Sequence, residues 1–260
     1  MKVELKGQVA LVTGAAQGIG KAIADKLSEN EARVVYTDVR YDAAAASASA
    51  WPQSTAMEMD VTKDGQVEEV INRTVRELGR LDILVNNAGV NTLEHRVTID
   101  EFPREEWDRL LAVDLTGLYV TSKAGARVMR SQGSGRIINI ASVAGIVPLR
   151  LQSAFVAAKA GVINLTRSMA IELGPCGILV NAIAPGSTLT EGTKRLFYGE
   201  GGTFRDSVQK LLDHIPLGRP ATTDEIAHAA LFLAAPESSY ITGHVLTVDG
   251  GWTAGYTREF

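Results

Sequence analysis

A cluster of glycines stands between an apolar segment and an amphipathic one near the start of the chain. The apolar segment, Gln8–Thr13, is rich in β-branched residues and predicts a buried strand. Gly14, Gly18 and Gly20 follow, and Lys21–Asn30 then has apolar residues at helical spacing. Glycines at such a turn let the backbone approach a pyrophosphate, whose charge is favoured at a helix N-terminus. This order of elements favours a dinucleotide site over an ordinary turn.

An acidic residue ends the second predicted strand, Arg33–Asp38. It stands about twenty residues beyond the glycines, where a carboxylate accepts hydrogen bonds from an adenosine ribose and repels a 2′-phosphate. The segment Ala15–Ile19 contains no Arg or Lys, and only Arg40 stands near Asp38. The sequence therefore favours NAD as the cofactor over NADP.

Strands and helices alternate along the rest of the chain. Further strands are expected at Thr55–Asp60, Leu81–Val85, Arg136–Ala141, Ile178–Ala184 and His244–Val248, and helices at Tyr41–Ala50, Lys63–Gly79, Pro103–Gly133, Ser153–Leu173 and Thr223–Leu233. Repeated βα units imply an α/β fold with a parallel, doubly wound sheet. Because no composition break divides the chain, we expect one domain over residues 1–260. A polar segment at about 187–216 is expected to cover the substrate cleft.

Composition restricts the class of function. The chain is 45% hydrophobic and 22% charged, and its net charge of −4 with scattered basic residues argues against nucleic-acid binding. No apolar run near the start is long enough for a signal peptide or a membrane span. The single cysteine, Cys176, fits a reducing compartment, and the four histidines have no metal-ligand spacing. We therefore expect a cytoplasmic protein without a metal site.

Two polar side chains are expected to meet where the strand Arg136–Ala141 ends. Ser142 follows this strand directly, and Lys159 lies on the next predicted helix. Ligands of open α/β sheets bind outside the carboxyl ends of the strands, so a hydroxyl and an amine there can share one cleft. Phe155 stands four residues before Lys159 and shares its helix face. An acid–base group at that position would be useful, but Phe155 carries no exchangeable proton.

These motifs together resemble those of the classical short-chain dehydrogenases/reductases over essentially the whole chain. The matching stretches are Thr13–Gly20, Asp60-Val61, Asn86-Asn87-Ala88-Gly89, Ser142, Lys159, Asn181, Pro185-Gly186 with Thr190, and Val248-Asp249-Gly250-Gly251. The resemblance implies a single Rossmann domain with a seven-stranded parallel sheet, a nicotinamide cofactor and a small-molecule substrate. It also implies a homotetramer packed through two long helices and the C-terminal strand. Sugar and polyol dehydrogenases look nearest within the family.

The resemblance implies a role for each matching residue. The cofactor would be held by Gly14, Gln17, Gly18, Ile19, Gly20, Asp38, Asp60, Val61, Asn87, Ala88, Gly89, Lys159, Pro185, Gly186, Thr188 and Thr190. Ser142 would hydrogen-bond the substrate oxygen, and Lys159 would also lower the pKa of a neighbouring acid–base group. Position around the cleft suggests substrate contacts from Asn91, His95, Ser142, Arg150, Gln152, Phe155 and Ser187. Arg150 could anchor a carboxylate, since Arg binds such anions bidentately.

Two positions depart from the pattern of the family. The catalytic tyrosine falls on Phe155, which keeps the ring and loses the hydroxyl. The proton-relay asparagine falls on Asp114, which cannot donate a hydrogen bond as an amide does. A positioned general acid–base typically supplies about 10²–10⁴-fold in rate, so the loss at Phe155 is serious. Tyr119 and Tyr198 are the nearest tyrosines in sequence, and the motif places neither in the site.

Three interpretations of Phe155 are open. In the first, the chain is an NAD-dependent dehydrogenase that interconverts a secondary alcohol, a sugar or polyol that could be acidic, and its carbonyl; Phe155 is then an introduced change that cripples turnover. In the second, a natural variant uses Ser142 with a water linked to Lys159 or Asp114. In the third, a silent member binds a dinucleotide or small ligand as a sensor or subunit. The retained Ser142 and Lys159 favour the first over the third.

Overall fold

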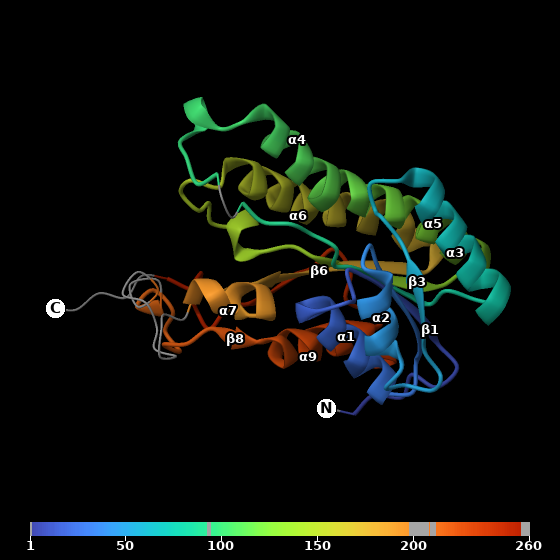
Figure 1. Ribbon diagram of the computed structural model, residues 1–260. Coiled ribbons are helices and arrows are strands. Elements are labelled where there is room, and N and C mark those ends of the chain that lie inside the picture. The colour runs from blue at the N-terminus through green and yellow to red at the C-terminus, as the bar shows by residue number, and fades with distance from the viewer. Residues whose placement is uncertain (1, 93–94, 198–207, 209–211, 256–260) are drawn as a thin grey trace.

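The computed structural model describes residues 2–92, 95–197, 208 and 212–255. Within these residues, seven parallel strands form one sheet in the order β3-β2-β1-β4-β5-β6-β9. The strands are β1 (Val9–Thr13), β2 (Arg33–Asp38), β3 (Thr55–Glu58), β4 (Ile83–Asn86), β5 (Gly135–Ile140), β6 (Ile178–Pro185) and β9 (Val245–Val248). The doubly wound α/β fold predicted from the sequence is confirmed (Figure 1).

Helices cover both faces of the sheet (Figure 1). One face carries α3 (Asp64–Leu78), α5 (Leu118–Gln132) and α6 (Ser153–Leu173), and the other carries α1 (Gly18–Glu29) and α9 (Thr223–Ala234). Further described helices are α2 (Tyr41–Ala48), α4 (Arg104–Leu111) and α7 (Glu191–Phe197), with short 3₁₀ turns η1 (Ile99–Glu101), η3 (Val143–Gly145), η4 (Gly174–Cys176) and η5 (Pro236–Ser238).

The strands carry the hydrophobic core on both of their faces. Successive strand side chains point to opposite faces, so Leu11 and Val35 pack in the layer of α3 and α5, while Val12 and Tyr36 pack in the layer of α1 and α9. All five residues of β1 are buried. A sheet covered on both faces needs apolar residues at every position of its central strands, which explains the continuous apolar runs in the sequence.

The helix expected over Pro103–Gly133 is interrupted in its middle. α4 ends at Leu111, a π-helical segment η2 (Ala112–Gly117) follows, and α5 then continues to Gln132. A π segment is wound more widely than an α-helix, so it changes the direction in which its side chains point. Sequence periodicity did not predict this segment, and it carries Asp114.

The chain after β6 forms a small addition to the main sheet. β7 (Thr188–Leu189) and β8 (Ala221–Thr222) pair in parallel, and β8 leads directly into α9. Neither short strand was predicted. Only part of the segment expected to cover the cleft, residues 187–216, lies among the described residues, where it forms β7 and α7. No helix in the described part of the chain is long and apolar enough to cross a membrane.

Candidate active site

The glycine turn between β1 and α1 is packed too tightly for side chains. Gly14 has a φ of +65°, and a Cβ at this position would lie 2.9 Å from the Ala88 Cα. A Cβ on Gly20 would lie 2.2 Å from the carbonyl oxygen of Gly14. Gln17, which precedes α1, gives the helix no side-chain cap. The first N–H groups of α1 therefore suit a bound anion such as a pyrophosphate.

Asp38 lies at the carboxyl end of β2 and is only 8% exposed. Its Oδ2 accepts a hydrogen bond from the Ala16 N–H at 3.1 Å, and its Oδ1 accepts one from the Arg40 N–H at 3.0 Å. The Arg40 Nε lies 3.6 Å from Oδ1, and Nη1 of Arg40 donates to Gln17 Oε1 at 3.2 Å. Backbone groups thus fix the carboxylate in place, and the Arg40 side chain stays beside it.

A pocket of about 470 Å³ joins the glycine turn to Asp38, a volume that suits a small organic ligand. The sequence-predicted cofactor residues that line it are Gly14, Gln17, Gly18, Ile19, Gly20, Asp38, Asp60, Val61, Asn87, Ala88, Gly89 and Thr190. Val39, Arg40, Met59, Val90 and Val113 complete the wall and were not predicted from the sequence. The donor groups at α1, the carboxylate of Asp38 and the pocket volume together fit an adenine dinucleotide.

A second cavity of about 550 Å³ adjoins this pocket and shares Ile19, Asn87, Gly89, Val90 and Thr190 with it. We call it the cleft. It brings together Asp114, Ser142, Phe155 and Lys159, which the sequence placed in one catalytic site. The other predicted residues that line it are Asn91, Arg150, Gln152, Pro185, Gly186, Ser187, Thr188 and Thr190. His95, expected at the same place, does not line the cleft, whereas its neighbour Arg96 does.

Ser142 follows Ala141 at the carboxyl end of β5. Its Oγ accepts a hydrogen bond from the Ala144 N–H at 3.1 Å, because Ser142 caps the 3₁₀ turn η3. A hydroxyl that accepts one hydrogen bond can still donate its own proton. The Ser142 hydroxyl, which lines the cleft, therefore still has a proton to donate.

Lys159 and Asp114 form a buried ion pair beside Ser142. The Lys159 Nζ lies 3.3 Å from Asp114 Oδ2, and their side chains are 7% and 0% exposed. Nζ also donates to the Ile140 carbonyl oxygen at 3.2 Å, while Asp114 Oδ1 accepts a hydrogen bond from the Val90 N–H at 2.7 Å. Asp114 Oδ2 has no hydrogen-bond partner among the described residues. The acid at position 114 thus compensates the buried ammonium directly.

The Phe155 ring lies beside this pair. Its centroid is 5.7 Å from the Lys159 Nζ, within the range of a cation–π contact. No tyrosine of the described residues lines the cleft. Tyr119 is on the outer surface of α5 and is 48% exposed, and Tyr198 lies outside the described residues. Among the described residues, the cleft therefore contains an aromatic ring beside Lys159 and no phenol.

Two arginines give the cleft a positive character. Arg150 was expected there, but Arg96 was not, because no motif marks it. Neither guanidinium forms an ion pair with a carboxylate of the described residues. Asp114 is the only acid among the described lining residues, and Lys159 already neutralises it. Trp252, also not predicted as a substrate contact, adds an aromatic wall.

Within the described ranges, no group of three or more His, Cys, Asp or Glu side chains is placed to hold a metal ion.

The sheet order, the glycine turn at a helix N-terminus and the adjoining pocket define a Rossmann-type nucleotide-binding protein. The family model described as enoyl-(acyl carrier protein) reductase matches residues 14–253. NAD-dependent glycerol dehydrogenase of Listeria innocua is 38% identical over 247 residues, covering 95% of this chain and 94% of that protein. The 3-oxoacyl-[acyl-carrier-protein] reductase FabG of Vibrio cholerae is 41% identical over 250 residues, covering 96% and 98%.

Solved structures agree with these matches. A gluconate 5-dehydrogenase from Burkholderia cenocepacia, in complex with NADP and tartrate, superposes with a TM-score of 0.90 at 33% identity, covering 97% of this chain and 98% of that one. The chain belongs to the short-chain dehydrogenase/reductase family of oxidoreductases.

Proposed function

We propose that this chain is an NAD-dependent dehydrogenase that interconverts a secondary alcohol and its carbonyl. The observation that carries the proposal is the meeting of Ser142, Lys159 and the Asp38 pocket at one edge of the sheet. A nicotinamide cofactor, when bound, would accept or supply the hydride. Ser142 would hold the reacting oxygen, and Lys159 would bind the nicotinamide ribose and stabilise negative charge near that oxygen.

NAD is the proposed cofactor because of Asp38. Two backbone N–H groups hold its carboxylate at the pocket wall, where it would bind the ribose hydroxyls and repel a 2′-phosphate. Arg40 is the one feature that favours NADP, but its guanidinium is already engaged by Asp38 and Gln17. The relatives divide on this point: the glycerol dehydrogenase is NAD-dependent, and the gluconate dehydrogenase structure contains NADP.

The proposed substrate is a sugar or polyol that carries an acidic group. Asn91 and Gln152 would supply polar contacts for hydroxyls, and Arg96 and Arg150, which form no ion pair within the described residues, suit a carboxylate. A glycerol dehydrogenase and a gluconate dehydrogenase among the relatives support a hydroxylated substrate. A second candidate is a 3-oxoacyl thioester, which the likeness to a 3-oxoacyl reductase favours. That substrate would need a longer apolar surface than the cleft, with its two arginines, provides.

Turnover by the chain with Phe155 is proposed to be slow. Ser142 and Lys159 are in place, but the proton of the alcohol has no positioned phenol to receive it. Because Ser142 and Lys159 are retained, an introduced change at Phe155 is favoured over a natural loss of function. The other two interpretations are outcomes of the tests: a natural variant that uses Ser142 with a water linked to Lys159 or Asp114, or a silent member that binds a dinucleotide or small ligand as a sensor or subunit.

We also propose a homotetramer and a cytoplasmic location. A shallow surface groove runs between α5 and α6, lined by Leu115, Thr116, Tyr119, Gly161, Asn164, Leu165 and Ser168. The apolar side chains of Leu115, Tyr119 and Leu165 would be covered if α5 and α6 packed against a second copy. The lone cysteine supports a reducing compartment. Sedimentation velocity would test the assembly, and a monomer at micromolar concentration would contradict it.

Calorimetric titration of the unaltered chain with NAD and with NADP tests the proposal before any activity is needed. The expected result is saturable binding of NAD, tighter than that of NADP. Oxidation of gluconate, glycerol and other polyols, and reduction of acetoacetyl thioester, would then be followed by dinucleotide absorbance. Binding of neither dinucleotide would contradict the proposed function as a whole.

A further inference from the structure

A third cavity, separate from the pocket and the cleft, lies at the opposite end of the sheet from the candidate active site, and its lining carries a net positive charge. It encloses about 520 Å³ at the N-terminal ends of the central strands. Its wall is made by Gln8 before β1, Arg80 and Asp82 before β4, the start of β5 at Arg136, and Leu179 near the start of β6. We call this cavity the basal cavity. None of its lining residues lines the pocket or the cleft described above.

Arg136 is the unusual residue of the basal cavity. Its Nη1 is buried and has no hydrogen-bond partner, and its Nη2 has only a long contact of 3.4 Å to the Pro236 carbonyl oxygen. No carboxylate of the described residues forms an ion pair with it. Burial lowers the pKa of the Arg136 guanidinium, and the charge of Glu237 only partly opposes this. The described residues thus satisfy the guanidinium of Arg136 poorly, and its Nη2 side is left able to bind an acceptor in the cavity.

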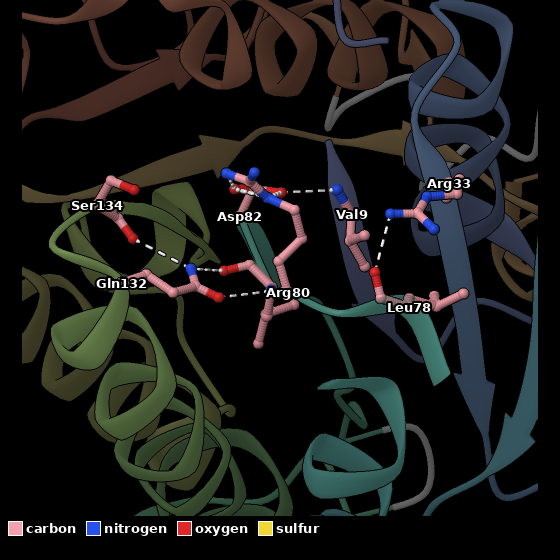
Figure 2. A network of polar contacts seen from close by, with 8 residues as sticks. Val9, Arg33, Leu78, Arg80, Asp82, Gln132 and Ser134 are labelled. Atoms are coloured by element: carbon pink, nitrogen blue, oxygen red, sulfur yellow. Dashed lines mark hydrogen bonds and ion pairs between the residues drawn. The ribbon is translucent and has the colours of Figure 1, made fainter. Parts of the chain in front are cut away.

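Arg80 supplies the second guanidinium of the basal cavity, and the neighbouring carboxylate, Asp82, is already held by hydrogen bonds. Its Nε and Nη2 bind the Asp82 carboxylate at 2.6 to 2.9 Å, and Asp82 Oδ2 also accepts a hydrogen bond from the Val9 N–H at 2.8 Å (Figure 2). Asp82 thus binds Arg80 and β1, and within the described residues these bonds use only Nε and Nη2 of Arg80. Two guanidinium groups and one carboxylate give the lining of the basal cavity a net charge of +1.

Polar side chains and glycines form much of the remaining wall of the basal cavity. Gln8, Ser134 and Ser239 line the basal cavity with Gly135 and Gly177. The Gln132 side-chain amide binds both backbone groups of Leu81, at 2.8 and 2.9 Å. It also donates to the Ser134 carbonyl oxygen at 3.5 Å, and Figure 2 shows Gln132 directed toward Ser134. The loop before β5 is therefore tied to the segment before β4, so the two arginines are carried by ordered backbone.

We propose that the basal cavity binds a small molecule that carries a carboxylate or phosphate group, with Arg136 and Arg80 as its anchors. The guanidinium of Arg136, whose Nη2 makes only the weak contact to Pro236, would donate to the oxyanion, and the guanidinium of Arg80 would share it, because guanidinium groups recognise such groups through parallel N–H donors. The volume exceeds that needed for a bare ion and lies in the range of small-molecule sites. This site is independent of the proposed dehydrogenase activity.

Titration calorimetry with inorganic phosphate and with malonate, against sodium chloride at equal ionic strength, tests the proposal. The unaltered chain is expected to bind one or both oxyanions saturably. Arg136→Met should weaken that binding about tenfold or more, as expected for loss of a hydrogen bond to a charged group. Arg127→Met is the matched control, because Arg127 is on the surface and pairs with Glu68. Arg136→Lys, which keeps the charge, serves if Arg136→Met does not fold.

The cleft also contains arginines, so its contribution has to be separated. The double variant Arg96→Met/Arg150→Met removes both guanidinium groups of the cleft and should leave the Arg136-dependent binding intact. Oxyanion binding that disappears in this double variant and persists in Arg136→Met would overturn the proposal. Binding of phosphate and malonate no tighter than that of chloride would show that the basal cavity holds solvent alone, and would overturn the proposal too.

Discussion

Asp114 and Lys159 face each other at 3.3 Å from two different helical segments, and both side chains are almost completely buried. The π segment presents the carboxylate, and α6 presents the ammonium. Buried ion pairs depend on both partners, because the loss of one leaves an uncompensated charge inside the protein. This pair therefore couples the stability of the fold to the chemistry of the cleft.

Removal of one partner should destabilise the protein strongly. Lys159→Met leaves Asp114 buried without its counter-charge, and we expect a loss of about 3–5 kcal/mol in the free energy of unfolding. The double variant Asp114→Asn/Lys159→Met should recover much of that loss, because no charge then stays buried. Urea unfolding measures both, with the exposed Lys123→Met as the control, expected within about 0.5 kcal/mol of the parent. Equal stability of parent and Lys159→Met would contradict the pairing.

Asp38 should decide between the two dinucleotides. Asp38→Ser removes the carboxylate that the Ala16 and Arg40 N–H groups hold at the pocket wall. Loss of hydrogen bonds to a charged group predicts an NAD affinity about tenfold to a hundredfold lower, with a relative gain for NADP. Calorimetry on the unaltered chain, on Asp38→Ser and on the surface variant Asp42→Ser gives the comparison. Tighter binding of NADP than of NAD by the unaltered chain would overturn the assignment.

The two arginines of the cleft should distinguish acidic from neutral substrates. In a Phe155→Tyr background, Arg96→Met and Arg150→Met should each raise the KM for gluconate by about tenfold, as expected for a lost charge-assisted hydrogen bond. The KM for glycerol, which has no carboxylate, should change little. An equal effect on both substrates would show that the arginines shape the cleft and do not select an anion.

The N-terminus of α9 should contribute stability that depends on pH. Arg219 first, and then the Thr222 N–H, lower the pKa of Glu225 from 4.5 to about 2. A depressed carboxyl pKa stabilises the fold above the ordinary pKa, so the contribution is complete above about pH 4.5 and is lost as the pH falls toward about 2. The side chain is 41% exposed, so solvent screening limits the effect.

Glu225→Gln should therefore cost about 0.5–1 kcal/mol at pH 7, the magnitude of an exposed ion pair with a helix cap. The difference from the parent should shrink as the pH approaches 2. Urea unfolding at a series of pH values measures it, with Glu191→Gln on α7 as the control, because Glu191 pairs only locally with Lys194. A difference that does not change between pH 7 and pH 3 would contradict the linkage.

Much of the fold followed from local patterns, but the structure of the cleft did not. Arg33–Asp38 and Ser153–Leu173 have the bounds that apolar periodicity predicts, because each packs on a continuous core layer. The π segment at Asp114 has no such signal, since it changes the backbone winding without changing the apolar pattern. Tertiary proximity alone brings Arg96 into the cleft, so no spacing along the chain predicted it.

The candidate site, too, was predicted from the sequence only in part. The sequence named Ser142, Lys159, Asp114 and Phe155, and the structure gathers all four around one cleft. The direct contact of Asp114 with Lys159 could not be predicted, because a side-chain distance depends on how the helical segments pack. The basal cavity had no motif at all: its arginines belong to two strand beginnings that meet only in the folded sheet.

Restoring one oxygen atom tests the central claim most directly. The Phe155 ring lies 5.7 Å from the Lys159 Nζ, so a phenol at this position would have the ammonium near it to stabilise its ionised form. With NAD and a panel of polyols and sugar acids, the rate of NADH formation by Phe155→Tyr should exceed that of the unaltered chain by about a hundredfold or more. Equal rates in the two proteins would contradict the account and leave the acid–base role to other groups of the cleft.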